Sequence, residues 1–104
     1  MPEFVDAVGR RIRLTAERLQ HLETDHPEMR DQIDRIGEGL SAPDQIVISG
    51  SDPTVELYYR LYPETPVTTK FLCIVVKNPA DDGFVITAYY TDTMKKGAVV
   101  WQKK

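Results

Sequence analysis

The two histidines of the chain, His21 and His26, lie five residues apart in a segment with a helical pattern. Histidine is the side chain whose ordinary pKa suits proton transfer near neutral pH, so acid–base chemistry is expected in this segment first. A spacing of five residues places the two rings about 140° apart around a helix, and the single cysteine adds no recurring ligand pattern. We therefore expect neither a metal ion nor another cofactor.

The helical angles give the two rings different surroundings. His21 shares a polar face with Arg18 and Asp25, and the Asp25 carboxylate, one turn away, is suited to orient the ring. His26 lies near the apolar stripe that contains Leu22 and comes at the end of the helix, which favours a packing or capping role. His21 is therefore the candidate catalyst, although a solvated surface histidine is the commoner alternative.

The pattern of residues predicts one α+β domain over 1–104, with two N-terminal helices packed on a four- to five-stranded antiparallel sheet. The first helix is expected to begin after Thr15 and reach Asp25, and the second to begin at Pro27 and fray near Gly37 to Gly39. Strands are expected at 11–14 (a short edge strand), 46–49, 56–62, 70–77, 84–91 and 99–101.

Alternation along the three long strands divides the sheet into a helix-covered face and an open face. The predicted helix-covered residues are Leu57, Tyr59, Leu61, Leu72, Ile74, Val76, Phe84, Ile86, Ala88 and Tyr90. The predicted open-face residues are Glu56, Tyr58, Arg60, Tyr62, Phe71, Cys73, Val75, Lys77, Val85, Thr87, Tyr89 and Thr91. The tyrosines on this face offer stacking planes, and Arg60 or Lys77 can hold a phosphate. Ordinary sheet patterning is the alternative, since half-buried sheet faces are often rich in tyrosine.

The charge of the chain argues against binding to nucleic acid by bulk attraction. The net charge is −3, with six arginines and ten acids in residues 1–45 and seven basic and six acidic residues in 46–104. Neutralising a nucleic-acid backbone needs clustered lysine and arginine. A small catalyst that contacts a few phosphates remains compatible with this distribution.

The same composition predicts a cytoplasmic protein that does not bind membranes. The longest apolar run, Phe71 to Val76, has the length of a strand, and the acidic N-terminus lacks the basic region of a signal peptide. The lone Cys73 lies inside that run and has no internal partner for a disulfide, so we expect a buried thiol in a reducing compartment.

Several motifs resemble small phage- and mobile-element-associated domains of the barnase–EndoU–colicin–RelE nuclease superfold. They are RRIRLTAERLQHLETDHPEM, LSAPDQIVIS, YYR, FLCIVVK and FVITAYYT, in that order, and the resemblance covers the chain from about Gly9 to Trp101. Members of this superfold are typically metal-independent ribonucleases. The resemblance implies attack of a 2′-hydroxyl on the adjacent phosphate, which leaves a cyclic phosphate and a 5′-hydroxyl. The chain departs from the ribosome-dependent members in lacking a dense basic patch.

The resemblance, together with the pattern of the open face, implies this chemistry at seven residues. An imidazole takes or gives a proton, a basic side chain stabilises the extra phosphate charge, and hydroxyl or aromatic groups contact phosphate oxygens or bases. The expected catalytic residues are His21, Arg60 and Thr87. The expected substrate-binding residues are His26, Tyr58, Lys77 and Tyr89.

Two hypotheses follow for the function. The first is a small endoribonuclease of the toxin or effector kind, with RNA as its substrate and an antitoxin or immunity protein as a further partner. The alternative is a non-catalytic binding or dimerisation module that keeps the nuclease fold, with the apolar segment from Ala98 to Trp101 pairing at a sheet edge in a homodimer.

Overall fold

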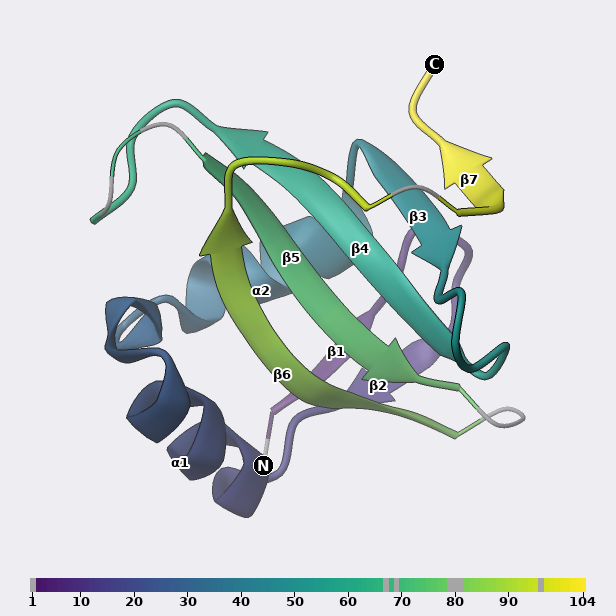
Figure 1. The fold of residues 1–104 in the computed structure, drawn as a ribbon. Coiled ribbons are helices and arrows are strands. Elements are labelled where there is room, and N and C mark those ends of the chain that lie inside the picture. Colours follow the sequence, from purple (N-terminus) through teal and green to yellow (C-terminus); the bar gives the residue numbers. More distant parts are fainter. Residues whose placement is uncertain (1, 67, 69, 79–81, 96) are drawn as a thin grey trace.

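The computed structural model describes residues 2–66, 68, 70–78, 82–95 and 97–104, and over these residues the chain forms one seven-stranded mixed sheet with two α-helices (Figure 1). The strands are β1 (Glu3–Val5), β2 (Arg11–Arg13), β3 (Gln45–Ile48), β4 (Val55–Tyr62), β5 (Lys70–Lys77), β6 (Gly83–Thr91) and β7 (Val99–Gln102). The helices are α1 (Ala16–Asp25), α2 (Ile33–Ser41) and the single 3-10 turn η1 (Pro27–Met29) between them.

The strands lie across the sheet in the order β1-β2-β6-β5-β4-β3-β7. β3 to β6 form the expected antiparallel meander, but β2 runs parallel to β6, with Ile12 opposite Gly83, and β1 extends that edge. The prediction of two N-terminal helices on a four- to five-stranded antiparallel sheet is therefore wrong. The three residues of β1 are too few for a periodic signal. The short strand expected at 11–14 is present as β2, but it pairs in parallel with a strand about 70 residues away in the sequence, which the pattern of residues did not predict.

The first helix begins where the sequence predicts. The hydroxyl of Thr15 accepts a hydrogen bond of 3.1 Å from the amide of Arg18, which satisfies one of the free donors in the first turn. The predicted start of the second helix at Pro27 is wrong, because Pro27–Met29 forms only a 3-10 turn and Asp31 adopts a left-handed φ of 61°. α2 therefore begins at Ile33.

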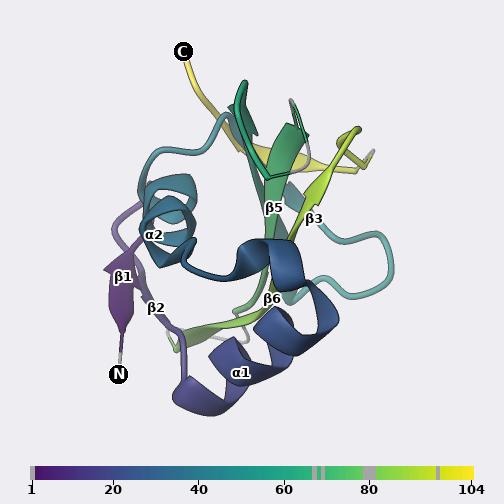
Figure 2. The ribbon, with the colours of Figure 1, turned by 90° about the vertical axis from the view of Figure 1, so that its left-hand side faces the viewer.

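Glycines allow α2 to pack closely on both sides, so the helix does not fray at Gly37 to Gly39. A Cβ on Gly39 would lie 2.7 Å from Cδ1 of Ile74, and one on Gly37 would lie 2.9 Å from Cε1 of Phe4. The sheet curls so that α2 lies between β1 on one side and β4 and β5 on the other, while α1 packs against β6 (Figure 2). None of the helices in the described part of the chain has the length and apolar content to cross a membrane.

Each face of the sheet carries an apolar cluster. The larger cluster lies under the helices and includes Leu22, Ile36, Tyr58 and Ile74, all at most 1% exposed. The smaller cluster lies on the open face, and its buried members are Val47, Leu57, Tyr59 and Cys73. The predicted burial of Cys73 is confirmed.

The predicted facing of the strands is right for β5, wrong for β4 and partly wrong for β6. Leu72, Ile74 and Val76 face the helices as expected. On β4, the residues opposite them are Arg60, Tyr58 and Glu56, so these side chains belong to the helix side, while Leu57 and Tyr59 belong to the open face. On β6, a bulge opposite Val75 and Val76 shifts the register, so that Val85 joins the core instead of Phe84 and Ile86.

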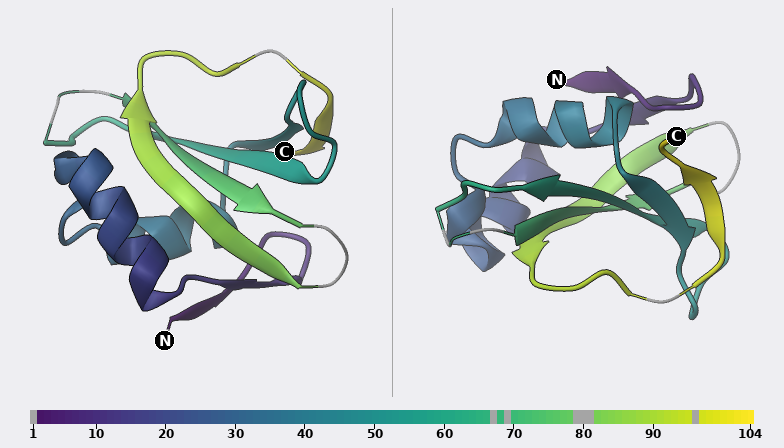
Figure 3. Two further views of the ribbon diagram at one scale, coloured as in Figure 1. Left: turned by 60° about the horizontal axis from the view of Figure 1, so that its bottom comes forward. Right: turned by 90° about the horizontal axis from the view of Figure 1, so that it is seen from above.

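Between β6 and β7 the chain crosses the open face of the sheet (Figure 3). We call residues 92–95 and 97–98 the strap. β7 follows β6 in the sequence but pairs with β3, near the far edge of the sheet. The chain therefore has to travel across β5 and β4 to reach its partner.

Candidate functional site

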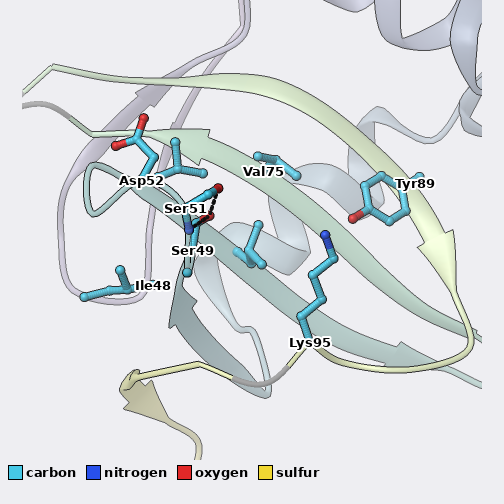
Figure 4. Close-up of a pocket in the computed structure, with 10 residues that line it drawn as sticks. Ile48, Ser49, Ser51, Asp52, Val75, Tyr89 and Lys95 are labelled. Atoms are coloured by element: carbon cyan, nitrogen blue, oxygen red, sulfur yellow. Dashed lines mark hydrogen bonds between the residues drawn. The ribbon is translucent and has the colours of Figure 1, made fainter.

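The strap and the open face of the sheet enclose a groove of about 610 Å³ (Figure 4). This volume lies within the range of small-molecule sites in proteins, about 300–1,000 Å³. The groove is lined by Ile48, Ser49, Gly50, Ser51, Asp52, Val55, Leu57, Val75, Tyr89 and Lys95. These residues come from the end of β3, the β3–β4 turn, the first half of β4, from β5 and β6, and from the strap.

The floor of the groove is apolar and belongs to the smaller cluster. Leu57 and Val75 are opposite one another on β4 and β5, and Val55 lies two residues further along β4. Leu57 is buried and Val75 is half-buried, so the floor keeps apolar surface that a ligand can cover.

Three contacts hold the strap above this floor. The amide of Lys95 donates a hydrogen bond of 3.0 Å to the hydroxyl of Tyr59. The side-chain amide of Gln45 lies 3.3 Å from Sδ of Met94. Next to Gly97, the amide of Ile48 on β3 donates a hydrogen bond of 2.9 Å to the carbonyl oxygen of Ala98. The strap is thus tied to both β3 and β4.

The two ends of the groove are polar. At one end, the amino group of Lys95 and the hydroxyl of Tyr89 point into the groove (Figure 4). At the other end, the hydroxyls of Ser49 and Ser51 lie 3.2 Å apart, and Asp52 forms an ion pair of 2.9 Å with Lys77. The groove therefore combines an apolar middle with two ends that can bind hydrogen-bonding groups.

Burial and hydrogen bonding shift the pKa values of groups near the groove. Burial raises the pKa of Tyr59 to about 12 and also raises the pKa of Tyr89, so both phenols stay protonated near neutral pH. Burial likewise raises the pKa of the Cys73 thiol, which interacts with both phenols. Hydrogen bonds from Thr54, and then from Lys77, lower the pKa of Asp52 to about 2.

This arrangement favours binding over acid–base catalysis. The Cys73 thiol is held neutral, and the Asp52 carboxylate is held charged and already accepts bonds from Thr54 and Lys77. A general base near neutral pH needs a pKa close to that pH, and neither group has one. Within the described ranges of the chain, no three histidine, cysteine or acidic side chains come together as a metal site.

The structure does not bring the three predicted catalytic residues together. The side chain of His21 is 64% exposed, and its Nε2 lies 3.8 Å from the Glu17 carboxylate on the outer side of α1. Arg60, predicted on the open face, lies on the helix side, where its guanidinium donates to the carbonyl oxygen of Ala42 at 2.5 Å. Thr87 lies on the open face opposite Val75. The sheet itself therefore separates Arg60 from Thr87.

Tyr58 is also on the opposite side from its predicted place. It is 0% exposed in the helix-side core, where its hydroxyl donates to Asp6 at 2.5 Å and accepts from Arg10 at 3.0 Å. This position leaves no surface for substrate binding. Both corrections have one cause: the facing of β4 follows its register with β5, and alternation of residue types along β4 alone does not determine it.

The other predicted binding residues lie around the open face. Tyr89 lines the groove, and Lys77 forms an ion pair with Asp52 at the far end of the groove. The ring of His26 packs against that of Tyr89, with the two centroids 5.4 Å apart. His26 thus combines the packing role expected from its helical angle with a place beside the groove.

Sequence reasoning missed the groove residues that belong to connections. Lys95 and the Ser49–Ser51 turn have no periodic pattern and match no phosphate-binding or nucleophile motif. The only available signal was the length of the 92–98 segment, which is long for a hairpin loop.

No family model, no curated protein and no solved structure matches the chain. The resemblance to the nuclease superfold therefore stays a prediction from sequence motifs.

Proposed function

We propose that this protein is a non-catalytic binding module and that the groove between the strap and the open face is its binding site. The observation that carries the proposal is the strap itself, which holds Lys95 above an apolar floor and leaves about 610 Å³ between them. Binding sites are typically concave, mostly apolar, and furnished with a few placed polar groups. The groove is concave and has polar groups placed at both ends of an apolar floor, and its lining as a whole is about equally polar and apolar.

Chemical-shift mapping by NMR tests this proposal directly, because the chain has only 104 residues. We expect small amphipathic molecules from a fragment panel to shift the amide signals of Val75, Tyr89 and Lys95. The matched variant Ser51→Trp places a large ring at the exposed rim and is expected to abolish these shifts while leaving the other signals in place. Shifts confined to any other surface, or no shifts with the whole panel, would contradict the proposal.

RNA cleavage is the second candidate function. The observation that favours it is the pairing of His26 with Tyr89 beside the face that also carries Thr87. An imidazole can move a proton while a neighbouring phenol stacks on a base. In this second candidate function, His26 transfers the proton, a role that the sequence analysis assigned to His21.

The nuclease candidate has its own test. Purified protein is incubated with tRNA, rRNA and mRNA, and the products are examined for terminal cyclic phosphate. If RNA is the substrate, His26→Ala removes the activity and His21→Ala does not. No cleavage by the unmodified protein leaves the binding module as the function.

Homodimerisation and an antitoxin or immunity partner stay predictions. β7 lies at one end of the strand order, with Val99 and Val100 49% and 48% exposed. Such an edge is a usual place for strand pairing between copies. Measuring the mass of the protein in solution over a range of concentrations tests homodimerisation directly.

A further inference from the structure

Among the described lysines, Lys95 and Lys104 form no ion pair with an acidic side chain, and of these two Lys95 lines the groove. Lys70, Lys77 and Lys103 each form an ion pair, with Asp92, Asp52 and Asp44 respectively. Among the described residues, no carboxylate lies within 4 Å of the amino group of Lys95. The ammonium group of Lys95 instead points over the apolar floor (Figure 4).

Tyr89 adds a second donor at the same end of the groove. Its hydroxyl and the amino group of Lys95 both point into the groove in Figure 4, and the Cys73 thiol interacts with both groups. Burial raises the pKa of Tyr89, so the phenol keeps its proton and can donate it in a hydrogen bond. A cation and a neutral donor at the same end of a groove form a pattern suited to an anion.

The far end of the groove does not contribute a net charge. Asp52 is neutralised by Lys77 at 2.9 Å, and its other carboxylate oxygen accepts from Thr54. Ser49 and Ser51 offer only neutral hydroxyls. Among the described residues that line the groove, Lys95 therefore carries the uncompensated positive charge at one end, and the other end offers a hydrogen-bonding surface.

The strand register gives the length between the two ends. Tyr89 is opposite Cys73, and Lys77 lies four residues further along β5. At the usual rise per residue, the Tyr89–Cys73 pair is therefore about 13 Å from Lys77 along the strand. Between them lie the apolar side chains of Leu57 and Val75.

We infer that the ligand of this groove is an amphipathic anion, with one carboxylate or phosphate group bound by Lys95 and Tyr89 and an apolar body lying on Leu57 and Val75. The inference rests on the proposed binding function and names the chemical class of its ligand. An anionic group gains a charge-assisted hydrogen bond from the ammonium group of Lys95, and neutral or cationic ligands of the same shape do not.

Three probes that share an aromatic body test this inference: 1-naphthoate, 1-naphthyl phosphate and neutral 1-naphthol. Each is titrated into the isotopically labelled protein, and Kd is obtained from the amide shifts of Val75 and Tyr89. We expect at least one of the two anions to bind about tenfold more tightly than 1-naphthol, as for one charge-assisted hydrogen bond. The comparison of carboxylate with phosphate shows which head group the site prefers.

Variants at Lys95 separate charge from shape. Lys95→Met is expected to remove the preference for the anions while 1-naphthol binds as before, and Lys95→Arg is expected to keep the preference. Lys103→Met removes an equal charge outside the groove and serves as the matched control, with no expected effect. A well-dispersed spectrum of each variant verifies its fold.

The outcomes distinguish this inference from the proposal beneath it. Equal binding of all three probes in the groove, unchanged by Lys95→Met, overturns the inference and leaves the binding module standing. A preference for anions that Lys103→Met weakens as much as Lys95→Met also overturns it, because general charge attraction then explains the effect. If no molecule of the fragment panel shifts the groove amides, both the inference and the proposed binding function are overturned.

Discussion

The amide of Lys95 in the strap donates a hydrogen bond to the hydroxyl of Tyr59 in the middle of β4, 36 residues earlier in the sequence. Tyr59 is 1% exposed, and its ring belongs to the apolar cluster of the open face. One side chain therefore supports the floor of the groove and also fixes the height of the segment above it.

Replacing Tyr59 with Phe is expected to loosen the strap without emptying the cluster. The lost hydrogen bond costs about 1 kcal/mol of unfolding free energy, which lowers the Tm of a domain of this size by about 4–8 °C. Thermal unfolding measures this loss, and NMR is expected to show altered amide signals along the strap. Tyr90→Phe is the matched control, because the hydroxyl of Tyr90 donates to Gln32 on the helix side. An equal response of the strap signals to both variants would show that Tyr59 does not hold the strap.

Gly97 is expected to tolerate no larger residue. In Gly97→Ala, the new Cβ meets Cγ1 of Val47 at 2.7 Å and a backbone oxygen of Ile48 at 2.8 Å, so the strap has to move away from β3. Such overpacking costs about 1–3 kcal/mol. Gly50→Ala serves as the control, since a Cβ at Gly50 has nothing within 4 Å. Urea unfolding of the two variants compares them; similar midpoints would contradict the close packing of the strap.

Asp52 is expected to make stability depend on acid pH. The pKa of Asp52 is about 2 in the folded protein, against an ordinary value of 3.8 that applies to the unfolded chain. The unfolded chain therefore binds the proton more readily. The stabilisation is therefore complete above about pH 5 and is lost as the pH falls through the folded pKa. The Tm difference between the unmodified protein and Asp52→Asn should be constant from pH 6 to 8 and shrink toward pH 2. A difference that stays constant down to pH 2 would show that the charge of Asp52 contributes nothing.

The two histidines are expected to respond differently to truncation. His21→Ala removes an exposed ring and should change the unfolding free energy by less than about 0.5 kcal/mol. His26→Ala removes the ring that packs on Tyr89 and should cost about 0.5–1.5 kcal/mol. Chemical denaturation measures both values, and only His26→Ala is expected to shift the Tyr89 amide. Loss of RNA cleavage in a folded His21→Ala protein would contradict this assignment.

The sequence predicted much of the central sheet because long strands carry a local signal. β5 reads as a continuous apolar run, and both its range of Lys70–Lys77 and its facing are confirmed. The cap at Thr15 was equally predictable, since it depends on neighbours three residues away. β1 was missed because three residues contain no period to detect.

The candidate site could be predicted only in part. Tyr89 and Lys77 were named because they lie on long strands, whereas Arg60 and Tyr58 were assigned to the wrong face. Their facing follows from the hydrogen-bond register of β4 with β5, and a shift of one residue inverts every side chain on a strand. Lys95 was missed because its role depends on where its loop travels.

By itself the sequence determined the α1 cap, the long strands and the burial of Cys73, because each depends on residues close together in the chain. Only the tertiary structure decided that β7 pairs with β3, so that the strap crosses the open face and Lys95 comes to lie over Leu57 and Val75. Pairing between distant strands is determined by long-range hydrogen bonds and shared burial. A local pattern of residues does not contain that information.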